Sequence, residues 1–140
     1  MRSEIMLGKI VQVAKVSNMI SKLYYSTMDG YKIVTDKHIF YILISNSQNC
    51  CERWGHMTSE DDISYYKGAE LLSIKLTDTA LNTTLVEDVI GDFYRCNTQF
   101  VDFTTNKGTF QIVVYNSHNG SYGHKILLIK DKEILLDDNI

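Results

Sequence analysis

The sequence predicts a mainly β domain, a twisted antiparallel sheet or half-barrel of about seven or eight strands with one short helix at residues 59–67. Two observations carry this prediction. Short β-branched and aromatic runs recur along the chain with turn residues between them, and residues 59–67 begin at a helix-start residue, Ser59, and are followed by a helix stop, Gly68. A length of 140 residues suits one domain, and no repeat or linker divides the chain, so we expect a single domain over 1–140.

The first strands come from the clearest patterns. Residues 8–16 alternate apolar and polar side chains, as a strand with one buried face does. Two strand-like runs flank Asp29-Gly30, a dipeptide that favours a hairpin turn because glycine tolerates positive φ. Residues 38–45 are apolar at odd and even positions alike, which predicts a central strand buried on both faces.

The acidic segment after these strands predicts the helix. Ser59 is placed to cap it, and acidic residues follow in the first turn, where they complement the helix dipole. Asp62 has the spacing of a capping-box-like partner of Ser59, and Gly68 ends the helix as its C-cap. Residues 69–78 return to strand alternation, whereas 80–91 are predicted as a loop or irregular turn.

The last third of the chain predicts further strands. Residues 92–105 and 108–116 are strand-like and meet at the turn signal Asn106-Lys107-Gly108. A glycine-rich turn over 117–124 then leads to residues 125–136, which supply the last strand or two.

Composition and charge limit the function classes. Apolar residues make up 44% and charged residues 22% of the chain, and the net charge of −3 argues against binding nucleic acid through total charge alone. Residues 59–102 hold nine Asp and Glu against three Lys and Arg, which suits a negative face for a basic partner, although a solvated surface is the simpler explanation. No apolar run is long enough to span a bilayer, and we expect a protein of the cell interior without membrane contact.

Two motifs supply thiol and imidazole groups. Cys50 and Cys51 follow the most apolar strand, and neighbours on an extended chain point to opposite faces, so one thiol in the core and one incidental thiol is one interpretation. A turn there would instead bring both thiols to one metal. His118 and His124 flank a turn with two glycines, where they either converge or lie on the surface of a hairpin. Two thiolates and two imidazoles are a common tetrahedral zinc set.

The acidic helix offers a different chemistry. Its carboxylates complement the helix dipole, and with two neighbouring rings they also suit a basic partner. The candidate partner contacts are Glu60, Asp61, Asp62, Tyr65 and Tyr66. The patterns GxxxxGK, GxGxxG and GxSxG are absent, so the sequence predicts a binding protein rather than an enzyme. A cysteine nucleophile with His118 or His124 as its base stays open.

Three blocks of the sequence resemble a family of small phage and prophage domains of unknown function. They are NSQNCCERWG (46–55), SEDDISYYKGAELLSIKLTD (59–78) and FVDFTTNKGTFQIVVYNSHNGSYGHKILLI (100–129). The resemblance covers residues 38–130, and its specific parts are the Cys-Cys-Glu block and the His-Asn-Gly-x-Tyr-Gly-His block.

The resemblance implies a phage-encoded accessory protein that acts in the cytoplasm of a bacterial host. Some similar proteins of streptococcal prophages are anti-CRISPR inhibitors of a type II effector nuclease, and at least one such inhibitor is thought to carry zinc. The resemblance also implies that one structural zinc site unites Cys50, Cys51, His118 and His124. Cys96 and His56 are reserve ligands, and Glu52 is placed to orient a histidine of the site.

Three functions follow as expectations. The first is an anti-CRISPR protein that binds the effector nuclease and blocks nucleic-acid loading or cleavage, without contacting nucleic acid itself. The second is a sponge that sequesters a nucleotide immune signal by aromatic stacking. The third is a zinc or cysteine hydrolase, which needs an open metal position or an activated thiol. For the oligomeric state we expect a monomer or a weak homo-oligomer.

Overall fold

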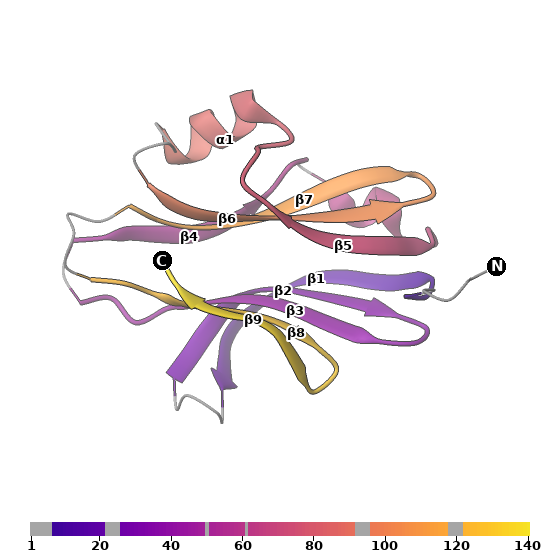
Figure 1. Ribbon diagram of the computed structural model, residues 1–140, viewed down its shortest axis with the longest axis horizontal. Coiled ribbons are helices and arrows are strands. Elements are labelled where there is room, and N and C mark those ends of the chain that lie inside the picture. The colour runs from indigo at the N-terminus through magenta and orange to yellow at the C-terminus, as the bar shows by residue number, and fades with distance from the viewer. Residues whose placement is uncertain (1–6, 22–25, 50, 61, 92–95, 118–121) are drawn as a thin grey trace.

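The computed structural model describes residues 7–21, 26–49, 51–60, 62–91, 96–117 and 122–140. Within these residues the chain forms nine strands in two antiparallel sheets, one α-helix and one 3₁₀ helix. The two sheets stack as layers, and no closed barrel forms from the described strands (Figure 1). The mainly β prediction is therefore confirmed, with one or two more strands than expected.

One sheet has five strands in the order β1-β2-β3-β8-β9. They are β1 (Ile10–Ser21), β2 (Ser26–Thr35), β3 (Ile39–Ser45), β8 (Lys125–Lys130) and β9 (Glu133–Asn139). β3 is hydrogen bonded on both sides, and Phe40, Ile42, Leu43 and Ile44 are all buried. The central strand predicted over 38–45 is thus confirmed, and residues 125–136 supply two strands.

The other sheet has four strands in the order β4-β7-β6-β5. They are β4 (Arg53–Thr58), β7 (Gly108–Ser117), β6 (Asn97–Thr105) and β5 (Leu71–Thr77). β6 and β7 form a hairpin in which Thr105 pairs with Gly108, so the turn signal at Asn106-Lys107-Gly108 is confirmed. Helix α1 (Thr83–Ile90) covers the outer face of this sheet, where Val86 and Ile90 pack in one buried cluster with residues of β4, β6 and β7 (Figure 1).

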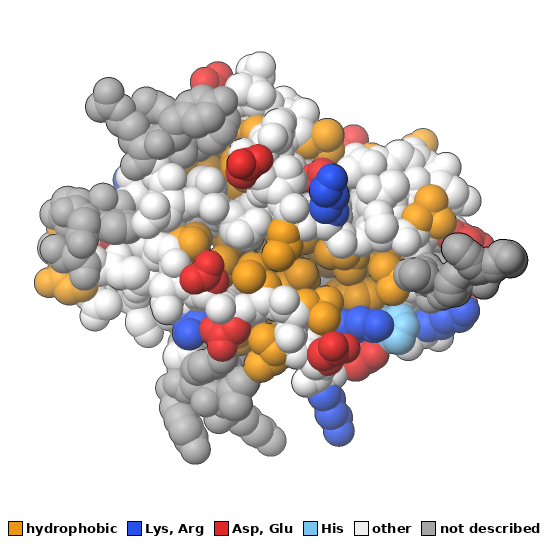
Figure 2. Space-filling model, viewed as in Figure 1, with side chains coloured by type: hydrophobic (Ala, Val, Ile, Leu, Met, Phe, Trp, Pro, Cys, Tyr) orange, Lys and Arg blue, Asp and Glu red, His pale blue; other side chains and the backbone are white. Residues whose placement is uncertain are grey.

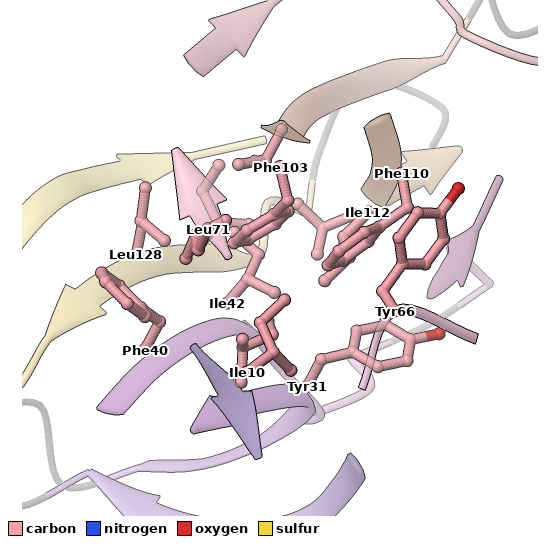
Figure 3. Close-up of a cluster of buried hydrophobic side chains, with 14 of the residues drawn as sticks. Ile10, Tyr31, Phe40, Ile42, Tyr66, Leu71, Phe103, Phe110, Ile112 and Leu128 are labelled. Atoms are coloured by element: carbon pink, nitrogen blue, oxygen red, sulfur yellow. The ribbon is translucent and has the colours of Figure 1, made fainter. Parts of the chain in front are cut away.

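The main core lies between the two sheets. Figure 3 shows Phe40 and Ile42 of one sheet opposite Phe103, Phe110 and Ile112 of the other. The rings of Phe103 and Phe110 stack with their centroids 5.0 Å apart. Each buried side chain of this size stabilises the fold by about 1.5–3 kcal/mol relative to an exposed one, so this cluster is what holds the layers together.

Exposed apolar and acidic side chains mark two edge strands. Leu72 and Leu76 of β5 and Ile134 and Leu135 of β9 are exposed, and Figure 2 shows an apolar band across this face of the molecule. The exposed acidic residues of β9 are Glu133, Asp137 and Asp138. Charges on an exposed edge strand oppose pairing with the strand of another chain.

The hairpin turn expected at Asp29-Gly30 is wrong, because both residues lie inside β2, where Gly30 pairs with Leu43. A Cβ at Gly30 would collide with the carbonyl oxygen of Ile42, so close strand approach requires the glycine. The Asp29 carboxylate accepts hydrogen bonds from the Asn18 N–H at 2.9 Å and the Asn46 side-chain amide at 3.0 Å. The dipeptide therefore stabilises the irregularity of β1 between Val16 and Met19 and does not form a turn.

The short helix predicted at 59–67 is confirmed only over part of its length, and its predicted cap is wrong. A 3₁₀ helix, η1, covers only Ile63–Tyr66, and Asp62 caps it by accepting from the Ser64 N–H at 2.9 Å. Ser59 is buried and does not cap, since its hydroxyl accepts from the Gln111 N–H at 3.0 Å. Residues 80–91, expected to be irregular, contain α1 instead, with Asn82 as N-cap. No helix in the described part of the chain has the length and hydropathy needed to cross a bilayer.

Candidate functional site

A buried histidine–glutamate pair lies where β3, β4 and β8 begin or end. His124 precedes β8 and Glu52 precedes β4, and Nε2 of His124 lies 3.2 Å from Oε2 of Glu52. Both side chains are fully buried. Nδ1 of His124 lies 2.7 Å from the Ser45 carbonyl oxygen, and because a carbonyl only accepts, Nδ1 carries a proton. The contact with Glu52 then needs one further proton, on the imidazole or on the carboxyl group.

The segment after β3 folds around this pair. The Asn49 N–H donates to Oε2 of Glu52 at 3.0 Å, and the Gln48 side-chain amide donates to the Glu52 carbonyl at 2.7 Å. The indole N–H of Trp54 donates to Oε1 of Gln48 at 2.8 Å, and its ring stacks on His124 with centroids 5.4 Å apart. The two sequence motifs therefore do meet, through Glu52 and Trp54, and the expected contact of Glu52 with a histidine is confirmed.

Further hydrogen bonds connect the same region to β7 and to Ile140. The His124 N–H donates to the Ile140 carbonyl at 2.6 Å, and the Ile140 N–H donates back at 2.9 Å. The buried Asn116 amide donates to the carbonyl oxygens of Tyr122 and Ile140 at 3.0 and 2.9 Å. Trp54 and Asn116 lie in the sequence blocks quoted above, but the sequence assigns neither of them a role, because their partners come from other segments of the chain.

The predicted zinc ligands are distributed unevenly. Cys50 and His118 lie outside the described residues, Cys51 is exposed and His124 is buried. Across the described ranges, no group of three or more His, Cys, Asp or Glu residues is arranged to hold a metal ion. Both ring nitrogens of His124 already contact protein oxygens, so a zinc ion would have to replace Ser45 or Glu52. The zinc site stays a prediction.

The reserve ligands lie in other parts of the fold. Cys96 is half-buried beside Tyr115 in the cluster under α1. His56 lies on β4 and packs edge to face on Tyr31 of β2, with ring centroids 4.8 Å apart. Burial lowers the pKa of His56, and the nearby Asp29 opposes that shift only in part.

The acidic turn before and within η1 is the second candidate site. Glu60 and Asp62 are exposed, and Tyr65 is 62% exposed, whereas Asp61 lies outside the described residues. Hydrogen bonds from the Ser64 hydroxyl and backbone N–H lower the pKa of Asp62, so its carboxylate is charged. The ammonium group of Lys107 lies 5.5 Å from the centre of the Tyr65 ring.

Tyr66 is a core residue and not a partner contact, which corrects the sequence prediction. It is 4% exposed and packs against Phe110 with ring centroids 4.8 Å apart (Figure 3). Burial, and then the nearby Glu60 carboxylate, raise the pKa of Tyr66 to about 12, so its hydroxyl stays protonated. The hydroxyl donates to the Thr109 carbonyl oxygen at 3.5 Å. Adjacent tyrosines on a 3₁₀ turn point in different directions, which is why only Tyr65 faces solvent.

The sequence of the chain matches one known family. The sequence profile of a domain of unknown function, DUF7448, matches residues 4–128. The chain belongs to DUF7448. The DUF7448 match includes Glu52, His124 and the acidic turn, and it ends inside β8, so β9 lies beyond it. No curated protein and no solved structure matches the chain significantly.

Proposed function

We propose that this DUF7448 chain is a phage-encoded anti-defence protein, an anti-CRISPR that binds a type II effector nuclease and blocks nucleic-acid loading or cleavage. The observation that carries the proposal is the exposed Tyr65 ring beside the exposed carboxylates of Glu60 and Asp62. Such nucleases hold their guide–target duplex in a positively charged channel. In such a channel the carboxylates would pair with the cations that otherwise bind phosphate groups, and the flat ring would stack where a base would stack. The acidic turn would therefore compete with a nucleic-acid strand.

The acidic turn is held in place before any partner binds. Tyr66 anchors it in the core, where its ring packs against Phe110 and its hydroxyl donates to the Thr109 carbonyl oxygen at 3.5 Å. The Thr58 hydroxyl donates to the Glu60 carbonyl at 2.6 Å, and Asp62 caps η1. A surface that is already ordered loses less conformational entropy on binding, so it supports tighter association.

The surrounding charge favours a basic partner. Residues 59–102 hold nine acidic against three basic residues, an excess that extends beyond the turn itself. Complementary charge raises the association rate and weakens with added salt. The proposal therefore predicts a complex whose association slows as the ionic strength rises.

The test is a pull-down and a DNA-cleavage assay with a purified type II effector nuclease, alone and loaded with guide RNA. We expect a complex and reduced cleavage, and we expect the triple variant Glu60→Gln, Asp62→Asn, Tyr65→Ala to lose both. The matched control is Glu133→Gln with Asp138→Asn, which removes exposed acids from β9 and should bind as the wild type does. No complex in either state, together with unchanged cleavage, overturns the proposal.

A further inference from the structure

The two sheets that the structure describes end in four edge strands, and β5 is the least protected of them. β9 carries three exposed acidic residues, and β1 is interrupted by two irregularities in its pairing with β2. In β4 only Arg53 is exposed, and the residues after it are half-buried or buried. Charges, irregularities and cover are the features that keep edge strands from pairing with other chains. β5 has Lys75 as its single charged residue, and Leu72 and Leu76 are 44% and 40% exposed.

The outer side of β5 is open beyond its first residue. The Leu71 N–H donates to the Gly8 carbonyl at 2.8 Å, so the segment before β1 covers that end of the strand. From Ser73 to Thr77 the inner side pairs with β6 in an unbroken register, and no described strand lies along the outer side (Figure 1). The main-chain N–H and C=O groups on such a side are a template for one more strand.

Ile74 and Leu76 lie on the core side of β5. Their partners on β6 are Phe103 and Val101, which are buried in the main core. At the open edge of the two layers this apolar surface belongs to the band that Figure 2 shows. A strand added to β5 would therefore bury apolar side chains as well as main-chain groups.

The exposed edge of β5 is complementary to itself. When a strand pairs with its own copy in antiparallel direction, a two-fold axis passes through one residue, and residues at equal distances from that axis face each other. An axis at Ile74 places Leu72 opposite Leu76 of the second copy. The same axis places Ser73 opposite Lys75, so the exposed leucines pair and no like charges meet.

The neighbouring registers are less favourable. A register shift of one residue would turn the core side of one copy to the outside, so the register changes in steps of two residues, which move the axis by one. An axis at Lys75 would set the two Lys75 side chains directly opposite each other, and like charges in that position destabilise a strand pair. An axis at Ser73 would require Leu71 to pair with the second copy, although its N–H already donates to Gly8.

We propose that β5 pairs with β5 of a second copy of this chain, antiparallel over residues 72–76, with Ile74 on the two-fold axis. The dimer joins two four-stranded sheets into one and covers both exposed edges, and its two-fold symmetry closes the assembly at two copies. The paired segment is much shorter than the roughly 20–30 residues a side of a standard interface, so we expect a weak dimer with a Kd of about 10 µM to 1 mM. No residue of the acidic turn takes part, so the dimer does not depend on the nuclease proposal.

Sedimentation equilibrium of the full chain measures the association without any partner protein. Over about 10 µM to 1 mM protein we expect a monomer–dimer equilibrium with a single Kd. In NMR spectra over the same range, the backbone amide resonances of Ser73 to Leu76 should shift with protein concentration, and those of β9 should not. A chain that stays monomeric up to about 1 mM, or one that forms assemblies larger than a dimer, overturns the proposal.

Variants test the register itself. Leu72→Lys and Leu76→Glu each remove both leucine pairs of the symmetric dimer and should each raise the Kd about tenfold. The double variant Leu72→Lys with Leu76→Glu places a cation opposite an anion in both pairs. At low salt it should restore the Kd to within about threefold of the wild type, and added salt should weaken this dimer. This rescue also shows that the substituted chains fold.

Leu135→Lys on β9 is the matched control, because Leu135 is 42% exposed and belongs to the same apolar band but not to β5. It should dimerise as the wild type does. A double variant that dimerises no better than the single variants would contradict the register. A Kd that rises as much in Leu135→Lys as in Leu76→Glu would show that the whole band, and not the β5 edge, makes the contact, and would overturn the proposal.

Discussion

His124 and Glu52 are 72 residues apart in the sequence, yet their side chains meet at 3.2 Å with neither exposed to solvent. The pair joins the segment after β3 to the segment before β8, and each member has a second partner, Ser45 for the imidazole and Asn49 for the carboxylate. This contact explains in physical terms why the Cys-Cys-Glu block and the block that ends in His124 belong to one domain.

The first prediction concerns this pair. Glu52→Ala should destabilise the fold by about 3–5 kcal/mol, because removal of one partner leaves the other polar group buried and unmatched. Chemical denaturation measures the loss. The double variant Glu52→Ala with His124→Ala should cost less than the sum of the single variants. Additive costs would show that the two side chains do not act together, and Glu133→Ala on exposed β9 is the control.

The second prediction concerns metal. The zinc site expected from Cys50, Cys51, His118 and His124 should give about one zinc per chain by elemental analysis and a Tm that falls when a chelator is added. Cys51→Ser should lower the Tm to the chelated wild-type value. His124→Ala removes the contacts with Ser45 and Glu52 too, so its Tm should fall further. An identical wild-type Tm with and without chelator excludes the zinc site.

The third prediction separates two adjacent tyrosines. Tyr66→Ala should destabilise the fold by about 3–5 kcal/mol because it empties a packed core position, whereas Tyr65→Ala should stay within about 0.5 kcal/mol of the wild type. Tyr65→Ala should nevertheless weaken binding to the effector nuclease. Thermal unfolding and the pull-down together measure the contrast, and a large stability loss in Tyr65→Ala would contradict the assignment of its ring to the surface.

The fourth prediction is a pH dependence at the β8–β9 turn. The Ile39 N–H and then His38 lower the pKa of Asp131 below its ordinary value of 3.8. A lowered pKa means that the carboxylate contributes stability above about pH 4, and this contribution disappears as the pH falls through the lowered value. Asp131→Asn keeps a residue that tolerates the positive φ of 57°. The variant should be less stable than the wild type at pH 7 and equally stable in strong acid, and a gap that widens in acid would contradict this.

The fifth prediction concerns the close approach of β2 and β3. Gly30→Ala should destabilise the fold by about 1–3 kcal/mol or more, because the new methyl group meets the Ile42 carbonyl in the middle of a sheet. Gly68→Ala is the comparison, since no atom lies within 4 Å of the place its methyl group would take and only its φ of 91° opposes the change. Denaturation midpoints should therefore fall more for Gly30→Ala than for Gly68→Ala.

Periodic patterns predicted the strands, because alternation in a half-buried strand and continuous apolar runs in a central strand follow directly from burial. Local turn and cap signals were less reliable. Asp29-Gly30 has a turn composition, but strand pairing and the irregularity in β1 use both residues inside β2. Ser59 is a residue type that favours helix caps, but its hydroxyl accepts a hydrogen bond from the Gln111 N–H of β7. In both cases a contact between segments distant in the sequence replaced the local preference.

The candidate sites show the same contrast between local sequence features, which could be predicted, and contacts between distant segments, which could not. The acidic turn could be located from composition, but not the burial of Tyr66, which depends on the position of Phe110. The contact of Glu52 with a histidine followed from the motifs, whereas Trp54 and Gln48 did not. A cavity of about 290 Å³ beside β4 is lined by residues of β1, β2, β4 and α1 and by Glu60 of the acidic turn, and no window of the sequence brings them together.

The strand β9 has a practical consequence for where this domain ends. The family match stops at residue 128, but β9 pairs along β8, Leu136 packs against the core, and Ile140 makes both backbone hydrogen bonds to His124. A fragment that ends at residue 128 would have a shortened β8 without its neighbour β9. It would also lack Ile140 and with it the two backbone hydrogen bonds that hold His124. Recombinant fragments of this chain should therefore extend past the family boundary by at least one strand.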